Sequence, residues 1–251
     1  MTNILITGGS EGIGLAVARL LAAESGTRLT LVARNEQKLK AAVAALPGQG
    51  HGHVVADLSR RPDTDALAQR LASRHYDVLI NNAGVGLYGR FADLPLEDQL
   101  KMMRLNMESV VVLSQAYLRQ AKRGDALVNT ASFLGYSPLP GAAVYSATKA
   151  FVAALSETLW WENKKKGIYV LGFSPGVTST NFHAAAGTPD ARFPKILLQS
   201  ADGAAKDLVR ALRKRAAPRA MGGVVTRLML SLQRLLPRKV AINMMGVNAP
   251  I

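Results

Sequence analysis

The stretch Thr7-Gly8-Gly9-Ser10-Glu11-Gly12-Ile13-Gly14 decides the fold, because it joins two segments of different periodicity. The apolar run Ile4–Thr7, typical of a buried strand, comes directly before it. The segment that follows has helical spacing, with apolar residues at Ile13, Val17, Leu20 and Leu21. A glycine-rich turn from a strand into a helix presents helix N–H groups and positive potential to a phosphate. The stretch therefore predicts a dinucleotide-binding turn, with an ordinary strand-to-helix turn as the alternative.

Each glycine of this turn has a separate expected task. Gly8 permits the tight turn, Gly12 lets the backbone approach a pyrophosphate, and Gly14 allows the helix to pack closely on the strand. Ser10 and Ile13 are the remaining candidate contacts to the cofactor in this turn.

The rest of the chain alternates strand-like apolar runs with longer helical segments. Continuous apolar runs of this kind predict a parallel sheet covered by helices on both faces, the doubly wound α/β or Rossmann fold. The carboxyl ends of the strands then share one edge, where such folds bind ligands. The runs are Ile4–Thr7, Leu29–Ala33, Val54–Ala56, Val78–Ile80, Ala126–Thr130 and Ile168–Phe173.

Composition limits the class of protein. With 49% hydrophobic and 19% charged residues, the 251-residue chain can bury a large core, and we expect one domain. Residues 1–221 would form it, including a substrate-covering segment at 181–194, and residues 222–251 would be an extension of the same domain. The absence of cysteine excludes a disulfide framework and a thiolate nucleophile. We expect no metal site, because His51 and His53 are best explained as a surface pair.

Arg34 follows the second run, where an NAD site usually carries a carboxylate for the adenosine ribose. A guanidinium at this position can pair with a 2′-phosphate instead. The sequence therefore favours NADP(H) over NAD(H), and an ordinary surface arginine is the alternative.

Tyr145 and Lys149 stand four residues apart in a helical segment, which places them on one helix face. A free tyrosine has a pKa near 10, and a neighbouring cation should stabilise the phenolate and lower that pKa. The pair can therefore act as an acid/base unit. Surface neighbours at helical spacing are the alternative.

The whole set resembles the short-chain dehydrogenase/reductase family, in its compact single-domain branch. The Thr7–Gly14 turn, Asn81-Asn82-Ala83-Gly84 and Tyr145-Ser146-Ala147-Thr148-Lys149 match the motifs of that family in order. The resemblance implies four catalytic residues, namely Asn106, Ser132, Tyr145 and Lys149. It implies further cofactor contacts at Asp57, Leu58, Asn82, Ala83, Gly84, Pro175, Gly176, Thr178 and Thr180.

The resemblance also implies the role of each residue. Ser132 would polarise a substrate carbonyl, Tyr145 would transfer the proton, Lys149 would hold the nicotinamide ribose, and Asn106 would hold a water molecule that connects Lys149 to solvent. We therefore expect an NADP(H)-dependent oxidoreductase for a carbonyl or secondary alcohol. The alternatives are a carrier-linked 3-ketoacyl reductase, although Glu11 replaces its usual arginine, and an NADP(H)-sensing protein without turnover.

The substrate side is expected to be hydrophobic. The segment from Asn181 to Pro194, with Phe182 and His183, resembles the mobile substrate-covering region of the family, and His183 is expected at its rim rather than as a base. Ordinary packing is the alternative for the other candidate apolar walls, which are Val85, Leu87, Tyr88, Leu134, Tyr136 and Leu139.

The C-terminal part departs from the pattern of compact relatives, which end with a seventh strand and a glycine-containing tail. An apolar stripe over Val224–Leu236 predicts an amphipathic helix. The net charge is +14, and ten Lys or Arg stand between Lys206 and Lys239 against Asp207 alone. Residues 223–236 could contact a membrane surface, pack on the domain or meet a partner subunit. We expect a cytoplasmic homodimer or homotetramer that acts on a small molecule and binds no nucleic acid.

Overall fold

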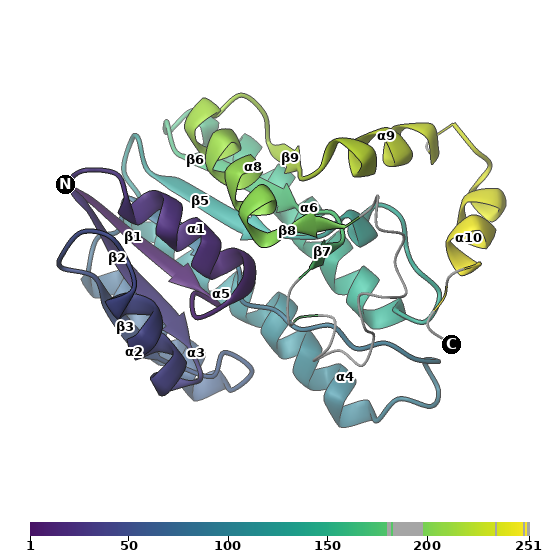
Figure 1. Cartoon of the computed structure of the whole chain (residues 1–251), viewed down its shortest axis with the longest axis horizontal. Helices are drawn as coiled ribbons and strands as arrows, with labels where there is room; N and C mark the ends of the chain where they lie inside the picture. Colours follow the sequence, from purple (N-terminus) through teal and green to yellow (C-terminus); the bar gives the residue numbers. More distant parts are fainter. Residues whose placement is uncertain (180–181, 183–197, 234, 248, 250–251) are drawn as a thin grey trace.

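The computed structural model describes residues 1–179, 182, 198–233, 235–247 and 249. A seven-stranded parallel sheet forms its centre, with the strand order β3-β2-β1-β4-β5-β6-β9 (Figure 1). The strands are β1 (Thr2–Thr7), β2 (Thr27–Ala33), β3 (Gly52–Val55), β4 (Val78–Asn81), β5 (Ala126–Thr130), β6 (Tyr169–Ser174) and β9 (Arg219–Met221). The predicted doubly wound sheet is confirmed, and each of the six predicted strands is present to within two residues at either end.

Helices cover both faces of the sheet, because the strands are continuously apolar and successive side chains point to opposite faces. Ile4 and Ile6 of β1 face one layer of helices, and Leu5 faces the other. The first layer holds α1 (Gly12–Ala22), α2 (Glu36–Ala44) and α8 (Ala201–Lys214). The second holds α3 (Arg61–Ser73), α5 (Ser109–Gln120) and α6 (Ala143–Lys164).

The strand order reverses between β1 and β4. From β1 the chain moves outward through β2 to β3, and it then returns to the other side of β1 with β4. Such a switch opens a crevice at the carboxyl ends of the two strands, which is where ligands bind in this architecture. The fold therefore places the glycine turn after β1 beside the Asn82 segment after β4.

One expectation about the C-terminal part is wrong, because the chain does form a seventh strand. β9 pairs in parallel with β6, in the register Gly172 to Arg219, Phe173 to Ala220 and Ser174 to Met221. Three residues are too few to produce a recognisable apolar run, and their strand conformation depends on the edge that β6 offers. A second, two-stranded sheet joins β7 (Thr178–Ser179) to β8 (Gln199–Ser200).

The predicted amphipathic helix is present as α9 (Val224–Gln233), and a helix that was not expected follows it, α10 (Arg238–Gly246). Pro237 is the N-cap residue of α10, a position where the N–H that proline lacks is not needed by the helix. Figure 1 shows both helices projecting from β9, away from the layers that cover the sheet. None of the helices in the described part of the chain is long and apolar enough to span a membrane.

Candidate active site

The glycine turn joins β1 to α1 in the geometry that its sequence predicts. Gly8 and Gly12 have φ angles of 66° and 58°, in the left-handed region that favours glycine. A Cβ at Gly14 would lie 2.2 Å from the carbonyl oxygen of Gly8 and 2.6 Å from Nδ2 of Asn82. Glycine is therefore required at position 14, because the start of α1 lies directly on the turn and on the end of β4.

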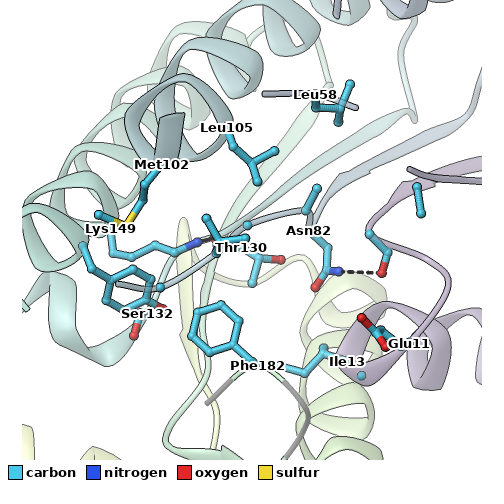
Figure 2. A pocket seen from close by; sticks show the side chains of 18 of the residues that line it. Glu11, Ile13, Leu58, Asn82, Met102, Leu105, Thr130, Ser132, Lys149 and Phe182 are labelled. Atoms are coloured by element: carbon cyan, nitrogen blue, oxygen red, sulfur yellow. Dashed lines mark hydrogen bonds between the residues drawn. The ribbon is translucent and has the colours of Figure 1, made fainter. Parts of the chain in front are cut away.

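Asn82 and Thr7 hold the two sides of the switch point together. Asn82 Nδ2 donates to the carbonyl oxygens of Thr7 (3.1 Å) and Gly8 (3.3 Å). The hydroxyl oxygen of Thr7 accepts hydrogen bonds from the backbone N–H groups of Asn82 and Ala83, each at 3.0 Å. Figure 2 shows the Asn82 amide reaching toward the end of β1. The Thr7 side chain was not among the predicted contacts, although it is the first residue of the motif.

The opposite end of the site carries Arg34 and Asp57, which follow β2 and β3. Burial alone would raise the pKa of Asp57, but hydrogen bonds from Ser59 and the positive charges of Arg34 and Lys101 lower it below its usual value. Asp57 Oδ1 accepts from the Ser59 N–H at 3.0 Å and from its hydroxyl at 2.7 Å. Asp57 is therefore a fixed carboxylate close to two cations.

Sequence reasoning missed two of the cations at this end. Lys38, in the first turn of α2, forms an ion pair of 2.8 Å with Glu11 of the glycine turn. Lys101 comes from α4 (Leu96–Met103). Lys38 could have been found as the lysine in the first turn of the helix that follows Arg34, whereas no strand-end pattern indicates Lys101.

Ser132, Tyr145 and Lys149 meet where β5 ends beside α6. Each of the three side chains is at least nine-tenths buried. The hydroxyl groups of Ser132 and Tyr145 are hydrogen bonded to each other. Lys149 Nζ donates to the carbonyl oxygen of Thr130 at 2.9 Å and lies 5.9 Å from the centre of the Tyr145 ring. Figure 2 shows the lysine side chain reaching toward Thr130, with Ser132 nearby.

The prediction that Lys149 lowers the pKa of Tyr145 is wrong for this structure. Burial raises the pKa of Tyr145 to about 12, and the hydrogen bond with Ser132 only partly offsets that rise. Burial also lowers the pKa of Lys149 to about 8, so this lysine loses its positive charge at a lower pH than an exposed lysine does. Spacing along a helix predicts that the two residues are neighbours, but their loss of hydration dominates the pKa values.

Asn106 lies in a π-helical turn, Arg104–Glu108, between α4 and α5. Its amide accepts from the Val85 N–H at 3.0 Å and donates to the Val85 carbonyl at 2.9 Å, and it also donates to Thr148 Oγ1 at 3.2 Å. These contacts hold the segment after β4 in place. A Cβ at Gly84 would lie 3.2 Å from Asn106 Oδ1 and 3.3 Å from Lys149 Nζ, so Asn106 and Lys149 approach each other across Gly84.

A cavity of about 770 Å³ runs along the carboxyl ends of the strands and connects these groups. Gly14 and Asn106 are not part of its lining, and Thr180 lies outside the described residues. Thr178 lines the cavity, and its hydroxyl donates to the Gly176 carbonyl at 3.0 Å. The other predicted residues that line it are Gly8, Ser10, Gly12, Ile13, Arg34, Asp57, Leu58, Asn82, Ala83, Gly84, Ser132, Tyr145, Lys149, Pro175 and Gly176.

The end of the cavity next to Tyr145 is apolar. The ring of Phe182 lies 5.7 Å and that of Tyr88 6.0 Å from the ring of Tyr145, measured between centroids. Val85, Leu87 and Leu134 also line the cavity as predicted, and Met102 was missed because it comes from α4. Tyr136 and Leu139 do not line the cavity, and they pack in the neighbouring apolar cluster instead. His183 and most of the 181–194 segment lie outside the described residues.

One group of possible metal ligands lies away from the cavity. In the described part of the chain, His75, Asp77 and Asp125 bring their ligand atoms within 4.8 Å of one another. The imidazole Nε2 of His75 lies 3.7 Å from Asp77 Oδ1 and 3.5 Å from Asp125 Oδ1. The three residues precede β4 and β5, at the edge of the sheet opposite the site.

The burial of Lys149 makes the stability of the fold depend on pH. Its pKa is about 8 in the folded chain and has the ordinary value of 10.5 when unfolded. Between these values the unfolded chain binds more protons, so the free energy of unfolding rises with pH, and this gain is lost as the pH falls through about 8. Between pH 8 and 10, the free energy of unfolding of the wild type should rise by about 2 kcal/mol relative to that of Lys149→Met. Urea unfolding measures both free energies. Parallel pH profiles of the two proteins would contradict this.

Comparison with known proteins gives a consistent result. A family model described as short chain dehydrogenase matches residues 2–190. An uncharacterised oxidoreductase of Staphylococcus epidermidis is 32% identical over 181 residues, which cover 70% of this chain and 77% of that protein. A short-chain dehydrogenase from Sphingobium yanoikuyae in complex with NADPH is 29% identical with a TM-score of 0.83, covering 94% of this chain and 96% of that one. A short chain dehydrogenase from Burkholderia cenocepacia in complex with NADP is 28% identical with a TM-score of 0.74, covering 87% and 94%.

Proposed function

This chain belongs to the short-chain dehydrogenase family of oxidoreductases, and on that premise we propose that it transfers a hydride between NADP(H) and the carbonyl or secondary alcohol of a hydrophobic small molecule. One observation carries the proposal: a single cavity is lined by the glycine turn, by Arg34 and by the buried Ser132–Tyr145–Lys149 group. A dinucleotide needs a phosphate-binding turn and a reactive end connected in this way.

The residues fit the cofactor at both ends. Gly8 and Gly12 leave the backbone of the turn open to a pyrophosphate, which the N-terminus of α1 attracts. Arg34 and Lys38 would hold the 2′-phosphate, and Lys149 would hold the nicotinamide ribose. When it is bound, the nicotinamide supplies the hydride.

In this proposal Tyr145 transfers the proton to the substrate oxygen. With its pKa near 12, Tyr145 is protonated at neutral pH and is therefore a proton donor rather than a base. Ser132, which is hydrogen bonded to Tyr145, would stabilise the negative charge that develops on the substrate oxygen. These properties suit the two groups to donate a proton to the substrate oxygen and to stabilise its charge during carbonyl reduction.

The substrate class follows from the wall beside Tyr145. Tyr88, Met102 and Phe182 present apolar surface there, which favours a hydrophobic ketone or aldehyde over a sugar. In this proposal the partners are the dinucleotide and the small carbonyl compound, and the assembly is a homodimer or homotetramer that light scattering can measure.

The test measures NADPH oxidation with a panel of hydrophobic ketones and aldehydes. The panel includes a free 3-ketoacyl compound, and the same ketoacyl group is also offered attached to an acyl carrier protein. We expect turnover of free carbonyl compounds. Tight NADPH binding without turnover of any substrate would contradict the proposal and favour a cofactor-sensing protein. Turnover of the carrier-linked substrate alone would favour a ketoacyl reductase.

Cofactor selectivity gives a second prediction. Arg34→Ala should raise the Kd for NADPH by about 10- to 100-fold, because a charge-assisted hydrogen bond contributes about 1.5–3 kcal/mol. The Kd for NADH should change little. Arg28→Ala, in the strand β2 that leads to Arg34 but outside the cavity, is the matched control and should affect neither cofactor. Fluorescence titration measures all four values, and an equal loss of affinity for both cofactors would count against a 2′-phosphate contact.

A further inference from the structure

The C-terminal arm, defined as α9 with α10, carries an apolar stripe on its outer side. Val224, Leu228 and Leu232 recur every four residues along α9 and are 71%, 61% and 57% exposed. In α10 and just beyond it, Val240, Met244 and Val247 repeat the pattern. Isolated exposed apolar residues are common, but a regular stripe over two successive helices indicates a contact surface.

The stripe is not the side of α9 that packs on the domain. α9 already uses its other side for that purpose, because Thr226 and Leu230 are buried. Leu230 belongs to the apolar cluster that also contains Tyr145. Of the three alternatives for this segment, packing on the domain applies to the side of α9 that holds Thr226 and Leu230, and it leaves the stripe exposed.

The charges around the stripe indicate its partner. After Asp207 the sequence contains no Asp or Glu, and nine Lys or Arg follow. Exposed Arg227 borders the stripe of α9, and exposed Arg238 and Lys239 begin α10. Helices with an exposed apolar side and flanking cations lie in the interface of an anionic bilayer, where basic side chains meet the headgroups.

A second copy of the chain fits this surface less well. A two-fold contact through the arm would bring the same cations of both copies together, with no carboxylate in the arm to pair with them. We propose that the C-terminal arm docks on an anionic lipid surface, with its apolar stripes in the acyl boundary and Arg227, Arg238 and Lys239 at the headgroups.

Docking would also bring the site close to the bilayer. A Cβ at Gly176, which lines the cavity, would lie 2.4 Å from Thr226 Oγ1, so the first turn of α9 packs directly against the cavity wall. The lipid would lie on the other side of the same helix. Only this consequence depends on the proposed function: a lipophilic carbonyl compound dissolved in the bilayer would be held next to the apolar end of the cavity.

The test is sedimentation of the full chain with phosphatidylcholine vesicles, with and without phosphatidylglycerol. We expect binding only with the anionic lipid, and loss of that binding at high salt. Leu228→Gln with Leu232→Gln should lower the vesicle partition coefficient at least about tenfold. Leu96→Gln in α4, which replaces an equally exposed leucine, is the control. Changing any one Lys or Arg of the arm to Gln should lower the vesicle partition coefficient about fivefold. Lys165→Gln should leave the partition coefficient unchanged.

Three results would overturn the docking proposal. They are no binding to either vesicle, equal binding to both, or a double leucine variant that changes the oligomeric state in light scattering while vesicle binding stays the same. NADPH binding and an unchanged unfolding midpoint show that each variant is folded. If docking fails while carbonyl reduction in solution is retained, the proposed function stands and only the surface proposal falls.

Discussion

Tyr145→Phe is expected to lower kcat for carbonyl reduction by about 10²- to 10⁴-fold, the usual contribution of a positioned proton donor. The ring remains, so its contacts with Tyr88 and Phe182 and the packing of the site should be retained. The Kd for NADPH should therefore change by less than about threefold. Stopped-flow oxidation of NADPH gives the rate, and a fluorescence titration gives the Kd.

The control for this variant is Tyr76→Phe, which removes a tyrosine hydroxyl outside the cavity and should leave kcat unchanged. Full activity of Tyr145→Phe would mean that the proton comes from another group. Equal losses in NADPH binding and in rate would mean that the hydroxyl supports the cofactor rather than the reaction.

Gly14→Ala is expected to have the second large effect. The new methyl carbon would lie 2.2 Å from the Gly8 carbonyl oxygen, which belongs to the backbone and cannot move without opening the turn. We expect a loss of about 1–3 kcal/mol in the free energy of unfolding, as for overpacked interiors. NADPH affinity should fall at least about 100-fold, because the turn would lose its charge-assisted contacts with the pyrophosphate.

Gly52→Ala is the matched control, since a Cβ there would meet nothing within 4 Å. It should stay within about 0.5 kcal/mol of the wild type and bind NADPH normally. Calorimetry and fluorescence titration measure both properties. If Gly14→Ala behaved like Gly52→Ala, the turn would be more open than the structure indicates.

Much of the fold could be predicted from the sequence, because buried parallel strands produce continuous apolar runs. The run Ala126–Thr130 corresponds to β5 residue for residue. β9 could not be predicted in the same way, since Arg219, Ala220 and Met221 have no apolar pattern and form a strand only by pairing with β6. Short edge strands depend on tertiary pairing more than on their own sequence.

The position of the candidate site was equally predictable, because residues that follow parallel strands share one edge of the sheet. That rule brought Arg34, Asp57, Asn82 and Ser132 to one cavity. It could not indicate Lys101, which reaches the cavity from the side of a helix. It also could not give the pKa of Tyr145, which depends on burial, and burial is set by residues distant in sequence.

The C-terminal part shows a different limit of sequence patterns. The apolar stripe around Leu228 and Leu232 was visible in the sequence, and it correctly predicted a helix. Periodicity identifies which residues share a face, but not what that face contacts. The structure shows that this face is directed outward while Leu230 packs inward.

Transfer of deuterium from NADPH labelled at C4 of the nicotinamide tests the central claim most directly. The wild type would be given a hydrophobic ketone that it turns over, with each C4 position labelled in turn, and the alcohol product would be analysed by mass spectrometry. The proposed function predicts one deuterium at the carbinol carbon from one of the two labelled forms. Unlabelled alcohol from both forms, or NADPH that binds beside Tyr145 without reducing any carbonyl compound, would contradict it.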